Sequence, residues 1–227
     1  MTAITATPTL SQFTCIPEWQ PATWEDYLAI GNDPDPMLNR VRVFFNEGYL
    51  FVEMGQEGIN HALFSNIFPV LFFLWFTRKS GEIQPYKCLG RCVIEKPKKR
   101  GGAPDLVLYI GDGAPEWVEG EPRRINLDNW RLPDLVGEVS DTTIATDLDE
   151  KKRLYAALGI PEYWVIDIKG KRVLAFRLQE DGNYQQCGYS VALAGLPIAI
   201  LDETLQRLSQ GDHASAALWF SQQIGGL

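Results

Sequence analysis

The sequence predicts an α/β fold in which a central mixed sheet is flanked by helices. Residues 135–140 (LVGEVS) have the apolar pattern of a buried strand, and residues 147–158 (DLDEKKRLYAAL) carry apolar side chains at helical spacing. Two further apolar strands are expected at 163–168 and 172–178. Gly159 directly follows the helical stretch, where glycine is a common C-cap. A strand, a helix and two strands in succession are typical of an α/β core.

Two elements are predicted near the N-terminus. A short helix is expected at 23–30, because Thr23 and Asp26 have the spacing of a capping box, in which each side chain satisfies a free backbone N–H group. The segment 41–54 alternates between apolar and polar residues around an Asn-Glu-Gly turn at 46–48. This pattern predicts a β-hairpin.

A strongly apolar helix is expected around residues 61–77. Pro69 lies inside it, so the helix should either kink at the proline or begin later than residue 61. The longest apolar run, 67–76, is shorter than the roughly 20 residues that span a bilayer. We therefore expect a buried core helix and no membrane partner.

The remaining elements suggest one main domain. A buried strand is expected at 105–110, and a helical tail at 202–220 with a break at Gly211. In the absence of repeats or low-complexity tracts, the expected organisation is an N-terminal extension over 1–40 with a short helix, followed by a single domain over 41–227.

The composition excludes several classes of protein. The 227 residues are 45% hydrophobic and 22% charged, close to the average for globular domains, with a formal net charge of −8. A chain this acidic is not a general polyanion binder. The one dense basic cluster, KPKKR at 96–100, is either a solvated loop between strands or a phosphate-contacting loop. The four scattered cysteines and the lack of a secretory signal in residues 1–20 favour free thiols in a reducing cytoplasm.

A carboxylate in the middle of a predicted strand is the main candidate for chemistry. Strand alternation places Glu138 on one face together with Asp134 and Ser140. A buried charge needs a cation, a metal or a proton. If the strand that follows Asp105 pairs beside it, two carboxylates would meet, and a divalent cation that prefers oxygen ligands would suit them. The bland interpretation, with Glu138 half-exposed on an edge strand and Asp105 capping a turn, stays open at this point.

The segment from Pro133 to Asp167 carries a long motif, PDLVGEVSDTTIATDLDEKKRLYAALGIPEYWVID. It closely resembles a prokaryotic family described as putative restriction endonucleases, within the PD-(D/E)xK nuclease superfamily. The shared pattern is a Pro-Asp strand, Pro-Asp-Leu-Val-x-Glu-Val, a Ser/Thr-rich turn, Asp-x-x-Glu-Lys, and Leu-Tyr-x-x-x-Gly-(Ile/Val)-x-Glu-Tyr-Trp before a strand that ends in Asp. The resemblance is weaker upstream and covers about residues 40–190.

This resemblance implies a restriction-endonuclease-like fold and hydrolysis of phosphodiester bonds with Mg²⁺ or Mn²⁺. By position in the motif, Asp105 and Glu138 would be the metal ligands. Ser140 stands where the superfamily usually has its lysine, and Lys151 on the next helix matches the migrated lysine of this family. Lys152 is the fallback, although one helical position rotates a side chain by about 100°.

Further candidates come from the start of the first long helix. His61 matches a recurrent histidine of the family. The residue before it is often Glu in relatives but is Asn60 here, and Glu57 is a candidate substitute. Asp134, on the same strand face as Glu138, is also a secondary candidate.

The sequence thus predicts a cytoplasmic, metal-dependent endonuclease acting on nucleic acid, with DNA as the expected substrate and a homodimer as the expected assembly. The alternative from another class is a catalytically silent nuclease-fold module that acts in nucleic-acid or protein interaction. The acidic surface and Asn60 favour the module, whereas Asp105, Glu138 and Lys151 favour the enzyme. A third interpretation is an α/β protein whose carboxylates are structural.

Overall fold

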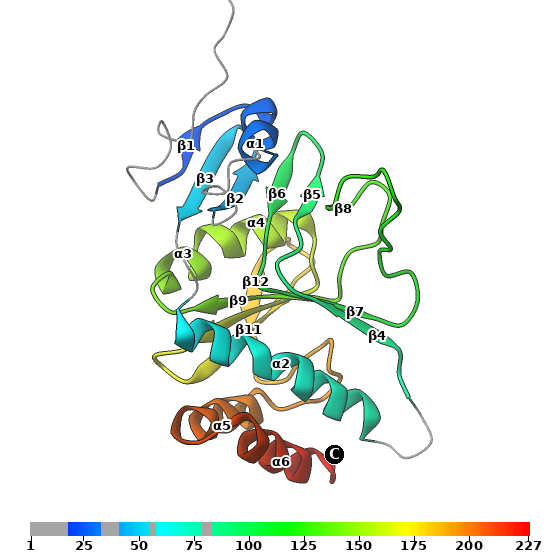
Figure 1. The fold of residues 1–227 in the computed structure, drawn as a ribbon, viewed down its shortest axis with the longest axis vertical. Helices are drawn as coiled ribbons and strands as arrows, with labels where there is room; N and C mark the ends of the chain where they lie inside the picture. The colour runs from blue at the N-terminus through cyan, green and yellow to red at the C-terminus, as the bar shows by residue number, and fades with distance from the viewer. Residues whose placement is uncertain (1–17, 33–40, 55–57, 79–82) are drawn as a thin grey trace, which may run out of the picture. The chain divides into compact units, whose positions relative to one another are not determined.

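Two mixed β-sheets organise the chain, one in each of two compact units. The structure is a computed structural model that describes residues 18–32, 41–54, 58–78 and 83–227. Unit 1 contains residues 1–56, 93–103 and 122–129, and unit 2 contains residues 57–92, 104–121 and 130–227. In the described part of the chain each sheet has six strands. Figure 1 shows the two sheets.

Unit 1 is a sheet with the strand order β1-β3-β2-β6-β5-β8 and one helix. Its elements are β1 (Gln20–Pro21), α1 (Trp24–Gly31), β2 (Val41–Asn46), β3 (Tyr49–Met54), β5 (Ile94–Lys96), β6 (Arg100–Gly102) and β8 (Ile125–Asn126). The predicted capping box is confirmed, because the Thr23 side chain accepts from the Asp26 N–H and the Asp26 carboxylate accepts from the Thr23 N–H. The predicted hairpin is also confirmed, with Glu47 (φ 44°) and Gly48 (φ 91°) in its two-residue turn.

The hairpin belongs to this smaller unit, which differs from the expected boundary at residue 40. Strand β2 pairs with β6 as well as with β3. Buried side chains of both hairpin strands, such as Phe45 and Leu50, pack against Tyr27 and Ile30 of α1. The hairpin therefore forms its core with the helix that precedes it.

The basic cluster at 96–100 forms the turn between β5 and β6. Lys96 pairs with Asp128 and Arg100 pairs with Glu47, both at 2.5 Å, so that each is compensated by an acid. Lys98 and Lys99 are exposed. The expected loop between strands is confirmed, whereas contact with phosphate stays a prediction.

Unit 2 is a sheet with the strand order β12-β11-β10-β9-β7-β4, covered by helices on both faces. Its strands are β4 (Tyr86–Leu89), β7 (Leu106–Ile110), β9 (Leu135–Ser140), β10 (Glu162–Asp167), β11 (Arg172–Leu178) and β12 (Tyr184–Gln186). Its helices are α2 (Ile59–Thr77), α3 (Ile144–Leu148), α4 (Glu150–Leu158), α5 (Ile198–Gln210) and α6 (His213–Ile224). Strands β9 and β10 pair in parallel, and the other pairs are antiparallel. The predicted α/β fold with a mixed sheet is confirmed.

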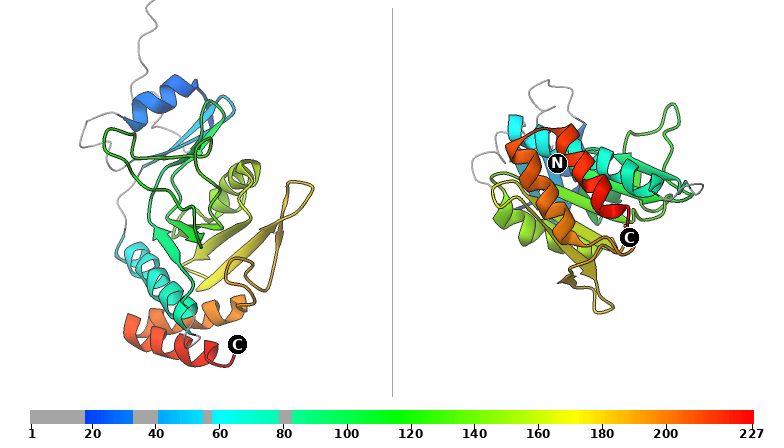
Figure 2. Two further views of the ribbon diagram at one scale, coloured as in Figure 1. Left: turned by 90° about the vertical axis from the view of Figure 1, so that its right-hand side faces the viewer. Right: turned by 90° about the horizontal axis from the view of Figure 1, so that it is seen from below.

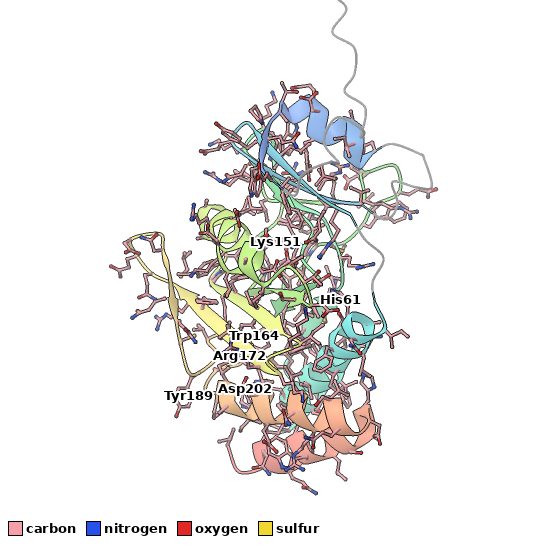
Figure 3. All side chains as sticks on the ribbon, turned by 90° about the vertical axis from the view of Figure 1, so that its left-hand side faces the viewer. His61, Lys151, Trp164, Arg172, Tyr189 and Asp202 are labelled. Carbon is pink, nitrogen blue, oxygen red and sulfur yellow. The ribbon has the colours of Figure 1, made fainter. Side chains whose placement is uncertain are left out.

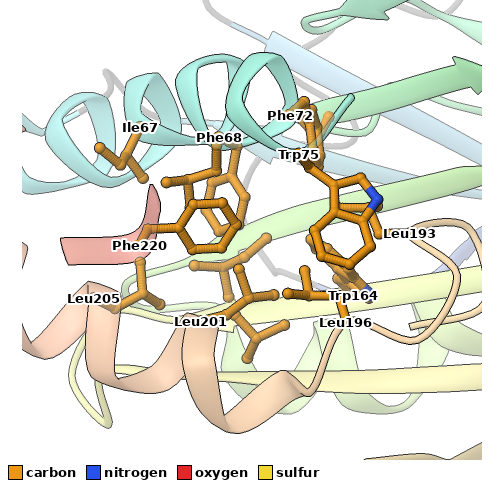
Figure 4. Close-up of a cluster of buried hydrophobic side chains, with 14 of the residues drawn as sticks. Ile67, Phe68, Phe72, Trp75, Trp164, Leu193, Leu196, Leu201, Leu205 and Phe220 are labelled. Carbon is orange, nitrogen blue, oxygen red and sulfur yellow. The ribbon is translucent and has the colours of Figure 1, made fainter. Parts of the chain in front are cut away.

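The two faces of this sheet have different chemistry. Helices α2, α5 and α6 lie on one side, and α3 and α4 lie on the other (Figures 1 and 2). Leu135 and Val139 of β9 and Trp164 of β10 point into the apolar core on the first side, which is shown in Figure 4. Strand alternation places Glu138 on the second side, beneath α3 and α4. We call this second side the polar face.

Helix α2 is one continuous helix with Pro69 inside it, so the alternative of a later start is wrong. In the described part of the chain it is the one helix long and apolar enough to cross a membrane, by length and composition only. Its buried residues belong to the core of unit 2, where Phe68 and Phe72 pack against Trp164 (Figure 4). Packing in that core accounts for the apolar side chains on the buried face of α2.

The helix expected at 147–158 is divided in the structure. Helix α3 ends before Asp149, whose backbone (φ −118°, ψ −82°) is not helical, and α4 follows directly. The prediction of one uninterrupted helix was wrong because nothing in the local residue types, such as Gly or Pro, marks the break. Gly159 (φ 83°) caps α4 as predicted, and α5 and α6 separate at Gly211 as predicted.

Glu162 binds the loop after β12 through hydrogen bonds on the apolar side of the sheet. Its buried carboxylate accepts from Trp164 Nε1 at 2.6 Å, from Ser190 Oγ at 3.1 Å, and from the N–H groups of Val191 and Ala192 at 2.9 and 2.6 Å. Burial raises the pKa of the Glu162 carboxyl, and the hydrogen bonds oppose that rise. The Glu-Tyr-Trp part of the motif therefore has a structural function on this side.

Replacing this carboxylate should destabilise unit 2. Glu162→Gln places an amide NH₂ group where an acceptor oxygen is needed, so we expect the free energy of unfolding at pH 7 to fall by about 1–3 kcal/mol. Denaturant unfolding followed by tryptophan fluorescence measures it. Glu180→Gln, at an exposed position, is the matched control and should change stability by less than about 0.5 kcal/mol. Equal effects of the two substitutions would contradict the assignment.

The stabilisation by Glu162 should also depend on pH. Because its pKa is raised from 4.5 in the folded protein, the folded state binds this proton more tightly than the unfolded chain. The part of the stability that comes from this proton is therefore fully present below about pH 4.5 and is lost as pH rises through the raised pKa, whereas the part that comes from the hydrogen bonds to the carboxylate remains at pH 7. We expect the difference in unfolding free energy between the natural protein and Glu162→Gln to shrink over this range. A difference that grows with pH would contradict the shift.

Candidate functional site

The pairing of β7 with β9 brings Asp105 beside Glu138. The antiparallel register pairs Leu106 with Gly137, and one more step places Asp105 next to Glu138. The Val139 N–H donates to Asp105 Oδ2 at 2.8 Å, which holds the carboxylate against β9. Asp105 is 7% exposed and Glu138 is 1% exposed. Both carboxylates are thus buried on the polar face.

Helix α4 supplies two partners for Glu138. Lys151 and Tyr155 are one turn apart and therefore lie on the same face of the helix. Lys151 Nζ donates to Glu138 Oε2 at 3.3 Å, and the Tyr155 hydroxyl donates to Glu138 Oε1 at 2.5 Å. Tyr155 is fully buried. It belongs to the stretch 147–158, whose apolar side chains predicted a helix, and its hydroxyl is a second donor to the carboxylate.

Asp147 is the third acid of this cluster. It is the first residue of the helix that the sequence predicts at 147–158, and its side chain is buried, with Oδ1 2.9 Å from Lys151 Nζ. This contact is an ion pair without hydrogen-bond geometry, since Asp147 Oδ1 has no hydrogen-bond partner. The other oxygen accepts from Thr143 Oγ1 at 2.6 Å. The i, i+4 spacing of Asp147 and Lys151 was the signal that could have revealed the pair.

His61 reaches the site from the first turn of α2. Its Nε2 lies 3.2 Å from Asp105 Oδ2, and its Nδ1 lies 3.3 Å from Ser65 Oγ. A carboxylate only accepts, so in the neutral ring Nε2 carries the proton and Nδ1 accepts from the serine hydroxyl. Figure 3 shows His61 on α2 and Lys151 on α4. Each of the two adjacent carboxylates is thus contacted by a helix, Asp105 by α2 and Glu138 by α4.

The negative charge of the cluster affects the pKa of Tyr163 on β10. Its pKa is raised well above 10, first by burial and then by the negative charges of Glu138 and Asp147. The neutral hydroxyl donates to the backbone oxygen of Asp147 at 2.9 Å. Tyr163 therefore remains protonated and holds α3 to the sheet.

The structure places the secondary candidates differently. Asp134 Oδ2 accepts from Arg131 at 3.0 Å and from the Ile110 N–H at 2.7 Å, near the start of β9 and away from Glu138. The Lys152 ammonium group lies 4.3 Å from the centre of the Phe176 ring, so it points away from the carboxylates. Asn60 is exposed. Glu57 lies outside the described residues.

The donors on the polar face fit a hydrated divalent cation. Carboxylate oxygens from Asp105 and Glu138 are the ligands that Mg²⁺ and Mn²⁺ prefer. Ser140 Oγ, on the same face of β9 as Glu138, and Asp147 Oδ1 are buried without a hydrogen-bond partner. In the described ranges, no group of three or more His, Cys, Asp or Glu residues could hold an ion. A cation here would therefore complete its shell with water, backbone carbonyls or substrate oxygens.

Comparisons with known proteins agree on the fold. No curated protein matches the chain. A crystal structure from Anabaena variabilis, described as that of a putative nuclease belonging to DUF820, is similar with a TM-score of 0.52 and 18% sequence identity, covering 82% of this chain and 99% of that chain. At this identity the likeness shows the fold alone. The model of the Uma2 family, described as "Putative restriction endonuclease", matches residues 24–221, and the chain therefore belongs to this family.

Proposed function

We propose that this protein is a nuclease that hydrolyses phosphodiester bonds of DNA with Mg²⁺ or Mn²⁺. The observation that carries the proposal is the convergence of Asp105 and Glu138 from adjacent strands, with the Lys151 ammonium group hydrogen-bonded to Glu138. Buried ionisable side chains that gather in this way are a common feature of functional sites. Membership of a family described by nuclease activity supports the same conclusion.

In this proposal Asp105 and Glu138 hold the cation. A bound Mg²⁺ or Mn²⁺ would polarise the phosphate and lower the pKa of a coordinated water. Other residues of the chain orient both carboxylates before any substrate binds. The Val139 N–H and His61 fix the Asp105 carboxylate, and Tyr155 fixes the Glu138 carboxylate. Such partners keep ligands in one orientation, so that binding needs little reorganisation.

Lys151 would stabilise the reacting phosphate. Its ammonium group is buried, and buried positive charge stabilises negative charge that develops in a transition state more strongly than exposed charge does. Its hydrogen bond to Glu138 places it next to the cation-binding carboxylate. Lys151 thus has the position of the migrated lysine that the motif implies.

The assembly and the location are part of the proposal. Cleavage of both strands of a duplex requires two sites, which supports a homodimer. Cys88, Cys92 and Cys187 are free thiols in the structure, which suits a reducing cytoplasm. The exposed Lys98 and Lys99 are available for contact with phosphates.

Removing either carboxylate should abolish cleavage. Asp105→Asn and Glu138→Gln keep the shape of the side chains but remove the charge that holds the cation. We expect cleavage of plasmid DNA in Mg²⁺ or Mn²⁺ to fall by about 10²-fold or more. Calorimetry should show that Mn²⁺ binding is lost in both variants. Asp134→Asn, directly before the same strand but bound to Arg131, is the matched control and should keep its activity.

The same measurements decide between the two classes of function. Retained cleavage by Glu138→Gln would contradict the site. If the natural protein neither binds Mn²⁺ nor cleaves DNA or RNA, it is a silent module, for which the exposed Asn60 in place of an acid is the favouring observation.

Two neighbouring lysines test the assignment of the ammonium group. Lys151→Gln should lower the rate of cleavage by about 10²-fold, because it removes the buried positive charge beside Glu138. Lys152→Gln should leave the rate unchanged, since Lys152 contacts Phe176. Single-turnover cleavage of plasmid DNA measures both, and circular dichroism checks the fold. The reverse order of effects would assign the reaction to Lys152.

A further inference from the structure

We infer that Asp147 is a positioning residue of this site, which keeps the Lys151 ammonium group from neutralising Glu138. The inference rests on the proposed function and adds a residue that the motif did not mark as functional. Asp147 would contact neither the cation nor the substrate. It would act through Lys151.

The Lys151 ammonium group forms ion pairs with two acids. Its Nζ lies 2.9 Å from Asp147 Oδ1 and 3.3 Å from Glu138 Oε2. All three side chains are at most 1% exposed, so water does not screen these charges. The acid that the motif does not mark as functional is therefore the closer of the two.

Asp147 itself is held in place from two sides. Thr143, the residue before α3, donates from its hydroxyl to Asp147 Oδ2 at 2.6 Å. Tyr163 of β10 donates to the Asp147 backbone oxygen at 2.9 Å. The interruption at Asp149 makes α3 a separate short helix, and these contacts attach it to its own N-cap residue and to β10.

The physical argument concerns competition for Glu138. Without Asp147, the buried ammonium group would have a stronger attraction to Glu138, because the Coulomb energy of close charges is large where water is excluded. A carboxylate paired in this way binds a divalent cation less well. With Asp147 present, the attraction of Lys151 is shared, and Glu138 keeps negative charge for the cation.

The test is the affinity for Mn²⁺ of the full-length protein, measured by calorimetry without substrate. We expect Asp147→Asn to bind Mn²⁺ about 10–100-fold more weakly, the usual effect of removing a partner that orients a ligand. Asp202→Asn is the matched control. Asp202 is on α5, on the other side of the sheet, where it accepts from the Val173 N–H of β11, and its loss should leave Mn²⁺ affinity unchanged.

A double-mutant cycle separates positioning from a direct electrostatic effect. If Asp147 acts through Lys151, Asp147→Asn should have no effect in a Lys151→Gln background. If Asp147 attracts the cation directly, the loss of affinity should be as large in that background as in the natural protein, which would overturn the inference.

Thr143→Val is a milder variant that keeps every charge and removes the hydroxyl that orients Asp147. It should weaken Mn²⁺ binding in the same direction and decides the question if Asp147→Asn does not fold.

Cleavage kinetics give a second readout. At saturating Mn²⁺, Asp147→Asn should lower kcat by about tenfold or more, with KM for plasmid DNA unchanged, because the misplaced ammonium group no longer reaches the phosphate. A natural protein that binds Mn²⁺ and cleaves, together with an Asp147→Asn variant that matches it in both, overturns this inference alone. A natural protein that does neither overturns both this inference and the proposed function.

Discussion

A single buried ammonium group is the interaction on which the polar face of the larger sheet depends. Lys151 contacts Glu138 on β9 and Asp147 on α3, and none of the three side chains is exposed to more than 1%. Removing one member of such a set leaves an uncompensated charge and commonly costs about 3–5 kcal/mol. The same contacts thus anchor α4 on the sheet and hold the ammonium group beside Glu138, so that stability depends on the same atoms as the proposed chemistry.

The elements that the sequence predicted correctly are those with local signals. The Thr23 capping box, the turn before Tyr49 and the glycine cap at Gly159 each depend on residues a few positions apart. The assignment of the hairpin to a separate unit could not be predicted, because its partner strands β5, β6 and β8 are only two or three residues long. Strands this short show no periodicity, and the sheet that they form depends on pairing between distant segments.

Strand alternation predicted the part of the candidate site that lies on the strands, and it did not predict the part that lies on the helices. The face of Glu138 and the approach of Asp105 follow from period-two alternation and from pairing of two buried strands. Lys151 required the family motif, since no spacing rule links a strand acid to a lysine thirteen residues later. Asp147 was missed because an acid near a helix start already has a local explanation, and its burial depends on contacts with Thr143 and Tyr163.

Helix α2 has a consequence for the order of events during synthesis. Its apolar surface leaves the ribosome before β7, β9 and β10, and α5 and α6, which complete the core, come last. Until α5 and α6 emerge, the nascent chain therefore carries a hydrophobic segment of 19 residues whose core is incomplete. Such a segment is a natural target for a chaperone at the ribosomal exit, and a chain truncated before α5 should aggregate rather than accumulate as a folded fragment.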